Sequence, residues 1–167
     1  MTFIELAAWR HSVRKYASTP VEDEKLAEIL EAARLAPTAA NLQPCRIIVV
    51  TGADARKKLS LAAETYGAPA ALIVCADKSR AWTRPFDGKN TSDIDAAIVT
   101  CHAMLCAADL GLGSVWICYF KPDVLKKKFA LGKDIEPVNI LALGYADESG
   151  DPAEKSRIPI EELVRFE

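Results

Sequence analysis

The stretch "AADLGLGSVWI", residues 107–117, decides which kind of α/β fold this chain can form. Its glycines, Gly111 and Gly113, make the only G-x-G of the sequence, and they stand after a helical segment and before a strand-like run. A dinucleotide-binding fingerprint needs the opposite order, with a strand first, a helix afterwards and a third glycine. The stretch therefore predicts a helix that ends in glycine and is followed by a strand, and it argues against a doubly wound nucleotide-binding sheet.

Helical and strand patterns alternate along the rest of the chain. Apolar spacing, caps and helix-stop residues predict helices at residues 3–10, 22–36, 54–67, 93–110 and 122–131. Runs of β-branched and apolar residues predict strands at 46–50, 70–76, 114–120 and 138–146. Four strands that alternate with helices favour an α/β or α+β sandwich, with a polar surface loop at 79–91. The closing segment becomes apolar again after residue 157, so we expect it to dock on another surface.

Composition and charge restrict the functional classes. The 167 residues carry a formal net charge of −2 and are 50% hydrophobic and 26% charged, as expected for one globular domain over residues 1–167. This slightly acidic balance argues against nucleic acid or an anionic membrane as a partner, because either needs a basic face. No apolar run reaches the roughly 20 residues that a membrane-spanning helix requires.

The five cysteines, an odd number, indicate reduced thiols rather than a disulfide framework. Residues 1–9 are short and carry Glu5, unlike the apolar core of a signal peptide, so we expect a cytoplasmic protein. No C-x-x-C occurs, and the spacing of Cys101, His102 and Cys106 does not suit zinc. We therefore expect no metal site.

A compact group of positive charge lies in "RHSVRKY", residues 10–16, called the head motif below. In an extended chain the side chains of Arg10, Ser12 and Arg14 point to one side, because the side-chain period is two. Two guanidinium groups and a hydroxyl on one side suit a phosphate monoester, which several charge-assisted donors can hold. A solvated basic turn after a short helix is the alternative interpretation.

Two further polar segments extend this pattern. The loop "PTAANLQP", residues 37–44, places the amides of Asn41 and Gln43 two residues apart, where they could read a heterocycle edge or bond their own loop. Lys155 and Arg157 are also two apart, and they could return two cations to a phosphate site or lie solvated in the tail. Each segment alone is ambiguous, but their order along the chain is informative.

The chain resembles the nitroreductase family of flavoproteins through four segments in a fixed order: "RHSVRKY", "APTAANLQPCRIIVV", "AADLGLGSVWI", and "LALGYADE" followed by "KSRIPIEELV". The resemblance covers essentially the whole chain. It implies an α+β fold with a central sheet of four to five mostly antiparallel strands flanked by helices. It also implies FMN at the interface of a homodimer whose subunits exchange their C-terminal tails.

The cofactor-binding residues that the resemblance implies are Arg10, His11, Ser12, Arg14, Pro37, Thr38, Ala39, Asn41, Gln43, Ile117, Cys118, Tyr119, Lys155 and Arg157. Residues 10–14 match positions that hold the FMN phosphate and ribityl chain, and the late cations 155 and 157 lie near that phosphate. Residues 37–43 match the loop that reaches the flavin from the partner subunit, with its amides near the ring. Residues 117–119 match the strand end whose backbone faces flavin N5.

The resemblance implies an FMN-dependent oxidoreductase. Hydride would pass from NADH or NADPH to flavin N5 and then, in a ping-pong cycle, to a nitroaromatic, a quinone or a similar small-molecule oxidant. No catalytic side chain is expected, because the chemistry is centred on the flavin. The alternatives are a non-enzymatic dimeric flavin-binding or sensing protein, and a different flavin chemistry on the same fold. Ferredoxin-type electron donors also stay open.

Three positions depart from the common family pattern. Ala39 stands where a second hydroxyl is frequent, Cys45 where an aromatic is frequent, and Cys118 where glycine or glutamate is frequent. The contact expected at position 118 comes from the backbone, so a cysteine side chain leaves it possible. These departures bear on the choice of oxidant more than on flavin binding.

Overall fold

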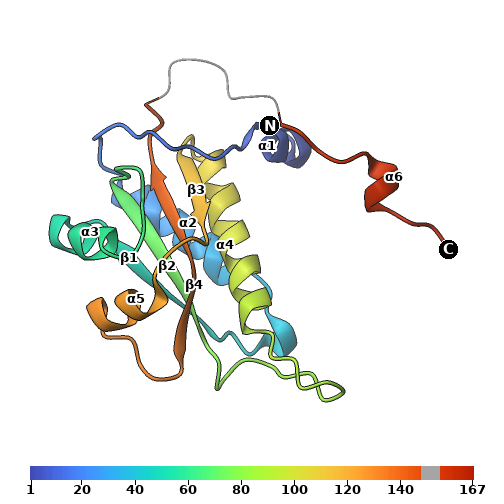
Figure 1. Cartoon of the computed structure of the whole chain (residues 1–167). Helices are drawn as coiled ribbons and strands as arrows, with labels where there is room; N and C mark the ends of the chain where they lie inside the picture. The colour runs from blue at the N-terminus through green and yellow to red at the C-terminus, as the bar shows by residue number, and fades with distance from the viewer. Residues whose placement is uncertain (148–154) are drawn as a thin grey trace.

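Four antiparallel strands form the centre of the molecule in the computed structural model, which describes residues 1–147 and 155–167 (Figure 1). The strands are β1 (Cys45–Val50), β2 (Ala70–Asp77), β3 (Gly113–Ile117) and β4 (Ile135–Gly144). Their order across the sheet is β1-β2-β4-β3, so β1 and β3 are the two edges. The predicted antiparallel α+β sandwich is confirmed.

Helices cover both faces of this sheet (Figure 1). The helices of the described residues are α1 (Phe3–Trp9), α2 (Asp23–Leu35), the 3-10 helix η1 (Ala39–Asn41), α3 (Ala53–Ser60), α4 (Ser92–Asp109), α5 (Pro122–Lys128) and α6 (Ile160–Leu163). Helices α2 and α4 pack on one face, and α3 and α5 pack on the other. The sheet therefore separates two apolar layers.

The central strand β2 explains why the sheet is so well buried. Its alternating side chains serve both layers: Leu72 and Val74 pack with α2 and α4, whereas Ile73 and Cys75 pack with α3 and α5. All four are 0% exposed. Burial of each large aliphatic side chain contributes about 1.5–3 kcal/mol, so β2 and its neighbour β4 fix the frame on which the loops are held.

Several predicted boundaries are wrong, among them the end of the helix predicted over 122–131, which the structure ends at Lys128. The helix predicted over 54–67 ends at Ser60, and the chain turns through Tyr66 and Gly67, whose φ angles are 57° and 73°. The strand predicted over 114–120 ends at Ile117, so the next residues leave the sheet. The strand predicted over 138–146 starts earlier, at Ile135, because its first residues pair with the end of β2.

The C-terminal segment 155–167 runs away from the body of the chain and carries the short α6 (Figure 1). Residues 148–154 of the predicted tail lie outside the described residues. The apolar side chains of the segment are largely exposed, namely Ile158, Ile160, Leu163, Val164 and Phe166. The predicted docking of these side chains is therefore not made within one chain. Among the helices of the described ranges, none is long and apolar enough to span a membrane.

Candidate functional site

The head motif lies against the outer edge of β3. The backbone N–H of Val13 donates to the carbonyl oxygen of Ser114 over 2.9 Å, and Ser12 and Ser114 form a parallel bridge. Gly113 permits this approach, because a Cβ atom there would lie 2.7 Å from a methyl carbon of the buried Val13 side chain. The head motif therefore extends the sheet locally, with Arg10 and His11 half-buried and Ser12 and Arg14 exposed.

Cations from both ends of the chain gather beside the head motif. Arg10 follows α1, and the Lys155 ammonium donates to the carbonyl oxygens of Ala7, at 3.2 Å, and Ala8 at the end of that helix. Burial, together with repulsion from Arg10 and then from Arg157, lowers the pKa of Lys155. Three neighbouring cations repel one another, and an anion between them would offset that repulsion. We call Arg10, Lys155 and Arg157 the cation group.

A small cavity of about 80 Å³ lies between the head motif and the start of β3. Arg10, His11 and Ser114 are among its lining residues. The Ser114 hydroxyl is buried, and in the described part of the chain it has no hydrogen-bond partner. A buried polar group of this kind is expected to be satisfied by a bound molecule or ion when no protein group serves it.

The other end of β3 presents backbone and side chains to solvent. Ile117 is buried, but Cys118 is exposed and Tyr119 is 96% exposed. Within the described residues, no partner is found for the Tyr119 backbone N–H. Ser114 and Cys118 are four residues apart, which is about 13 Å along a strand. The cation group therefore lies near the start of β3, and a backbone N–H without a partner among the described residues follows its end, at a spacing that suits an elongated anionic ligand.

The predicted loop 37–43 lies far from that edge in the same chain. Its Ala39 N–H donates to Asp95 at the N-terminal end of α4, whereas the cavity beside Arg10 is lined by Ala108 at the other end. Thirteen helical residues separate these points by about 20 Å. The structure therefore brings Lys155 and Arg157 to the head motif and places residues 117–119 at the other end of β3, but it leaves loop 37–43 about 20 Å from the cavity beside Arg10.

The backbone of the loop is strained. Ala40, Asn41 and Gln43 have φ angles of 50°, 54° and 50°, a region that costs a non-glycine residue roughly 1 kcal/mol or more. The Thr38 hydroxyl accepts from Gln43 N at 3.0 Å, and Gln43 Nε2 donates to the Asn41 carbonyl at 3.2 Å. In this chain the two amides thus bond their own loop, which was the second interpretation of the sequence. Pro37, Asn41 and Gln43 remain exposed.

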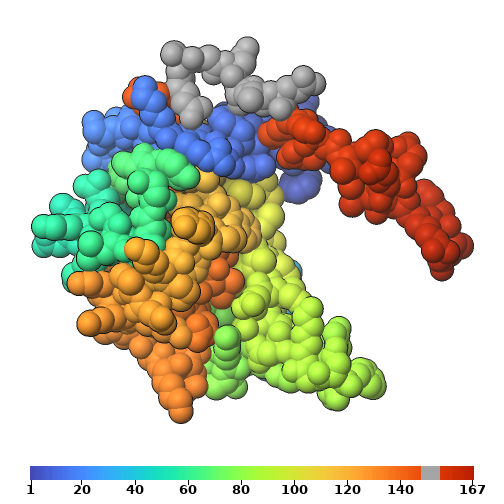
Figure 2. Space-filling view, viewed as in Figure 1, coloured from blue at the N-terminus to red at the C-terminus, as the bar shows by residue number. Residues whose placement is uncertain are grey.

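A large cavity beside Tyr119 was not predicted. Its volume is about 780 Å³, and it is lined by α3, by the turn that follows α3, and by residues 119–121. Helices α3 and α5 share this side of the molecule (Figure 2). Arg56, Lys57 and Lys121 line the cavity, and none of them forms an ion pair within the described ranges. The sequence "ARKKL" carried the charges but gave no sign of the cavity.

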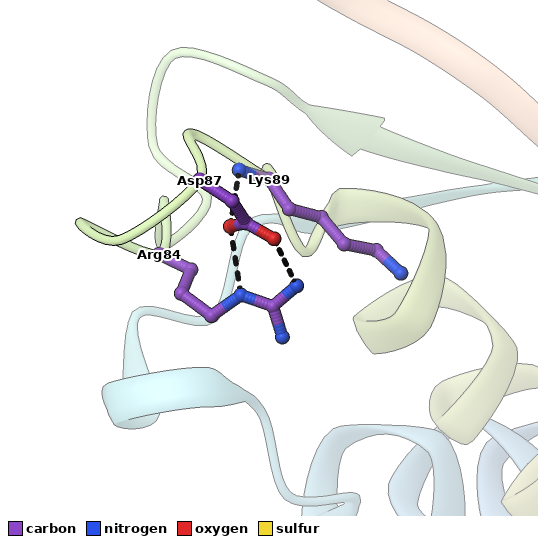
Figure 3. Close-up of polar contacts among 3 residues, drawn as sticks. All are labelled: Arg84, Asp87 and Lys89. Atoms are coloured by element: carbon purple, nitrogen blue, oxygen red, sulfur yellow. Dashed lines mark hydrogen bonds and ion pairs between the residues drawn. The ribbon is translucent and has the colours of Figure 1, made fainter.

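The loop between β2 and α4 projects from the body of the molecule (Figures 1 and 2). The Arg84 guanidinium holds the Asp87 carboxylate with two hydrogen bonds, and the backbone N–H of Lys89 donates to the same carboxylate at 3.1 Å (Figure 3). Phe86 at the tip is 94% exposed. The structure thus presents an aromatic side chain on a loop that is braced internally.

The cysteines differ strongly in environment. Burial raises the pKa of Cys75 to about 11, and burial together with the negative charge of Asp95 raises the pKa of Cys45 to about 11. Both thiols therefore stay protonated near neutral pH and are poor nucleophiles. Cys118, by contrast, is exposed.

The comparisons with known proteins agree on one family. The model of the Nitroreductase family matches residues 7–65 and 60–145. A nitroreductase family protein from Clostridium difficile 630, known from its crystal structure, is 49% identical, with a TM-score of 0.96 over 100% of this chain and 99% of that chain.

Two further similar proteins carry functional names. An FMN-dependent nitroreductase from Clostridium difficile R20291 is 27% identical, with a TM-score of 0.82 and 98% of each chain covered. An FMN reductase from Bacillus subtilis whose name specifies NAD(P)H is 32% identical over 90% of this chain and 67% of its own length.

Proposed function

The chain belongs to the nitroreductase family, and from that premise we propose that it is an FMN-dependent oxidoreductase that takes electrons from NADH or NADPH. The observation that carries the proposal is the cation group, Arg10, Lys155 and Arg157, in which Lys155 bonds the end of α1 next to Arg10. A phosphate among these cations would offset their mutual repulsion and accept several charge-assisted hydrogen bonds. The relatives named for FMN support the choice of this phosphate-bearing cofactor.

The residues along β3 fit FMN in their chemistry. The cation group, with Ser12 and Arg14 of the head motif, would hold the phosphate and ribityl chain. The buried Ser114 hydroxyl, which lacks a partner in the described residues, supplies a further donor beside the head motif. At the other end of the strand, the Tyr119 backbone N–H would bond the ring edge. We propose residues 1–167 as a single domain built around this site.

When bound, FMN would supply the two-electron chemistry of the reaction. The head motif and the late cations fix its position through the phosphate. The Tyr119 N–H is a fixed dipole held by the end of β3, so it can stabilise negative charge that develops on the ring edge. The cavity beside Tyr119 leaves room for a donor or an oxidant next to that edge.

We expect the electron donor and the oxidant to bind one after the other in the cavity beside Tyr119. The cavity that adjoins Tyr119 has a volume of about 780 Å³. Steady-state kinetics should therefore follow a ping-pong pattern, with NAD(P)H as donor and a nitroaromatic, a quinone or a similar compound as oxidant. The exposed Phe86 offers an aromatic surface to such planar oxidants if its loop reaches the site of a second subunit.

A homodimer is part of the proposal, because one chain leaves loop 37–43 about 20 Å from the cavity beside Arg10, judged from the rise along α4. Apolar surface for such an interface is abundant: a groove of about 690 Å³ runs between α1 and α4. Phe3 and Ile4 on α1 are 66% and 75% exposed, and Phe166 in the tail is 94% exposed. Exposed apolar surface of this extent marks an interaction site, and the tail of a second copy would cover it.

The purified protein tests this proposal through its mass in solution and its flavin content. We expect a dimer with about one FMN per subunit, measured by light scattering and by the visible flavin spectrum. A monomer that binds FMN tightly would contradict the shared site. A protein that fails to take up added FMN would contradict the proposed function itself.

A further inference from the structure

Asp95 is a buried carboxylate that forms no ion pair with the residues the structure describes. It lies in the first turn of α4 and is 0% exposed. Among the described residues, none of the lysines, arginines or histidines forms an ion pair with it. A buried carboxylate is strongly unfavourable unless hydrogen bonds satisfy it, so its partners indicate what it does. The N-terminal end of α4 also favours negative charge at this position.

The partners of Asp95 come from two separate loops. Its Oδ1 accepts from the backbone N–H of Ala39 at 2.8 Å, and its Oδ2 lies 3.3 Å from the hydroxyl of Thr91. The Thr91 hydroxyl also lies 3.1 Å from the carbonyl oxygen of Trp82, and Thr91 N donates to that carbonyl at 2.9 Å. One carboxylate therefore joins the loop at residues 37–43 to the base of the loop at residues 82–91.

Loop 37–43 needs a contact from outside the loop to keep its conformation. Its left-handed residues Ala40 and Asn41 are strained, and its other hydrogen bonds between residues 38 and 42 are internal to the loop. In the part of the chain that the structure describes, the bond from Ala39 to Asp95 is what ties η1 to another helix. Strained backbone persists only where its surroundings over-determine it, and Asp95 provides that constraint.

The second loop is braced by its own contacts but is joined to the body at few points. Its internal bonds run from Arg84 to Asp87 and from Asn90 to Thr83 (Figure 3 shows the first). Its end is closed by Thr91 on Trp82, at the position where Asp95 meets Thr91. The orientation of the whole loop, with Phe86 at its tip, is therefore set close to the same carboxylate.

We propose that Asp95 is a positioning residue, which fixes loop 37–43 and the base of loop 82–91 in one arrangement without touching the cofactor. The inference rests on the proposed function, in which loop 37–43 completes the FMN site of the partner subunit. Asp95 then acts on that site from a distance. Loss of the Asp95 carboxylate leaves the cation group intact. It removes the constraint on loop 37–43, through which the second subunit completes the FMN site.

Amide hydrogen exchange of the cofactor-free and FMN-loaded protein tests the anchoring directly. In Asp95→Ala, exchange in segments 37–43 and 82–91 should rise at least about tenfold, because the Ala39 N–H loses its buried acceptor. Asp95→Asn keeps an oxygen that can accept from Ala39 and should stay within about threefold of the wild type. Asp93→Ala removes an exposed carboxylate from the same helical turn and should change neither segment.

Unchanged exchange in both segments of Asp95→Ala would overturn the anchoring role, whether or not the protein binds flavin. If Asp95→Ala does not fold, Thr91→Val tests the anchoring role instead. This variant removes only the Thr91 hydroxyl from the contact between Thr91 and Asp95. It should increase exchange in 82–91 and leave 37–43 protected. Equal increases in both segments, or none in either, would contradict the separate contacts assigned to Asp95.

A functional measurement on the holoenzyme then tests the positioning. Asp95→Ala should raise the KM for the oxidant at least about tenfold, because loop 37–43 of the partner subunit is loosened rather than removed. Asp95→Asn should keep the KM near the wild-type value. If Asp95→Ala loosens the two loops but changes neither the KM for the oxidant nor the FMN affinity, the positioning role is overturned. A wild-type protein that binds no FMN would refute the proposed function alone, because the exchange experiment reports on Asp95 independently.

Discussion

The backbone N–H of Val13 donates to the carbonyl oxygen of Ser114 over 2.9 Å, so the head motif and β3 run side by side. This one bond aligns two segments that are a hundred residues apart in the sequence. It places Arg10 beside the start of β3, while Cys118 and Tyr119 follow the end of the same strand. A ligand that lies along this edge can therefore meet cations at one end and a backbone N–H at the other.

Gly113→Ala should disturb this alignment. The new Cβ would lie 2.7 Å from Val13 Cγ2, and Val13 is buried and β-branched, so it cannot move aside cheaply. We expect a loss of about 1–3 kcal/mol in the free energy of unfolding, together with weaker FMN binding. Denaturant unfolding and flavin titration measure both. Gly52→Ala is the control, because a Cβ there meets nothing within 4 Å; similar effects from both variants would contradict the explanation.

Arg10→Ala tests the cation group. A charge-assisted hydrogen bond to a phosphate contributes about 1.5–3 kcal/mol, so the Kd for FMN should rise by roughly tenfold or more. Fluorescence titration of the cofactor-free protein measures this change. Arg80→Ala, an exposed arginine in the turn after β2, should leave the Kd unchanged. An Arg10→Ala variant with wild-type affinity would remove Arg10 from the phosphate site.

Thiol labelling should distinguish the cysteines. Cys118 is exposed and follows β3, whereas Cys75 is fully buried with a pKa raised to about 11. An alkylating reagent at pH 8 should modify Cys118 first and leave Cys75 unmodified in the folded protein. FMN should slow the modification of Cys118, as peptide mass spectrometry can show. Labelling at the same rate with and without FMN would separate Cys118 from the cofactor site.

Stability should fall at alkaline pH. The folded pKa values of Cys45 and Cys75 are about 11, above the ordinary value of 9.0. The folded state holds these protons more tightly than the unfolded state does. The contribution of the two thiols to the free energy of unfolding is therefore complete below pH 9 and is lost as the pH rises towards 11. By pH 10.5, ionisation of each thiol should lower the free energy of unfolding by up to about 2 kcal/mol. Denaturant unfolding at pH 8 and pH 10.5 measures the fall, and a Cys45→Ala/Cys75→Ala variant should show a smaller one.

Much of the fold could be predicted because local signals agreed with tertiary packing. The strand at β2 and the helix at α2 have apolar patterns that burial in the sheet layers satisfies, so their predicted and observed ranges nearly coincide. The end of α3 at Ser60 was not predicted, and the left-handed conformation of Tyr66 in the turn that follows is not signalled by a tyrosine. The early start of β4 reflects pairing with β2, a non-local interaction.

The candidate site could be predicted only in part for a related reason. Arg10 and the late cations carry charge that is visible in the sequence, and the structure brings them together. Asp95 gave no signal, because one carboxylate in the first turn of a helix is ordinary and its partner Ala39 is distant in the chain. The cavity beside Tyr119 was also missed, since it exists only once α3 and the end of β3 are packed together.

The central claim is that this chain carries electrons through FMN, and one anaerobic titration tests it most directly. The visible spectrum of the purified protein, supplemented with FMN if needed, is recorded before and after addition of NADH or NADPH. We predict a flavin spectrum that bleaches with at least one of the two donors and returns when a quinone is added. A bound flavin that neither donor reduces, or a protein that binds no flavin, would contradict the account.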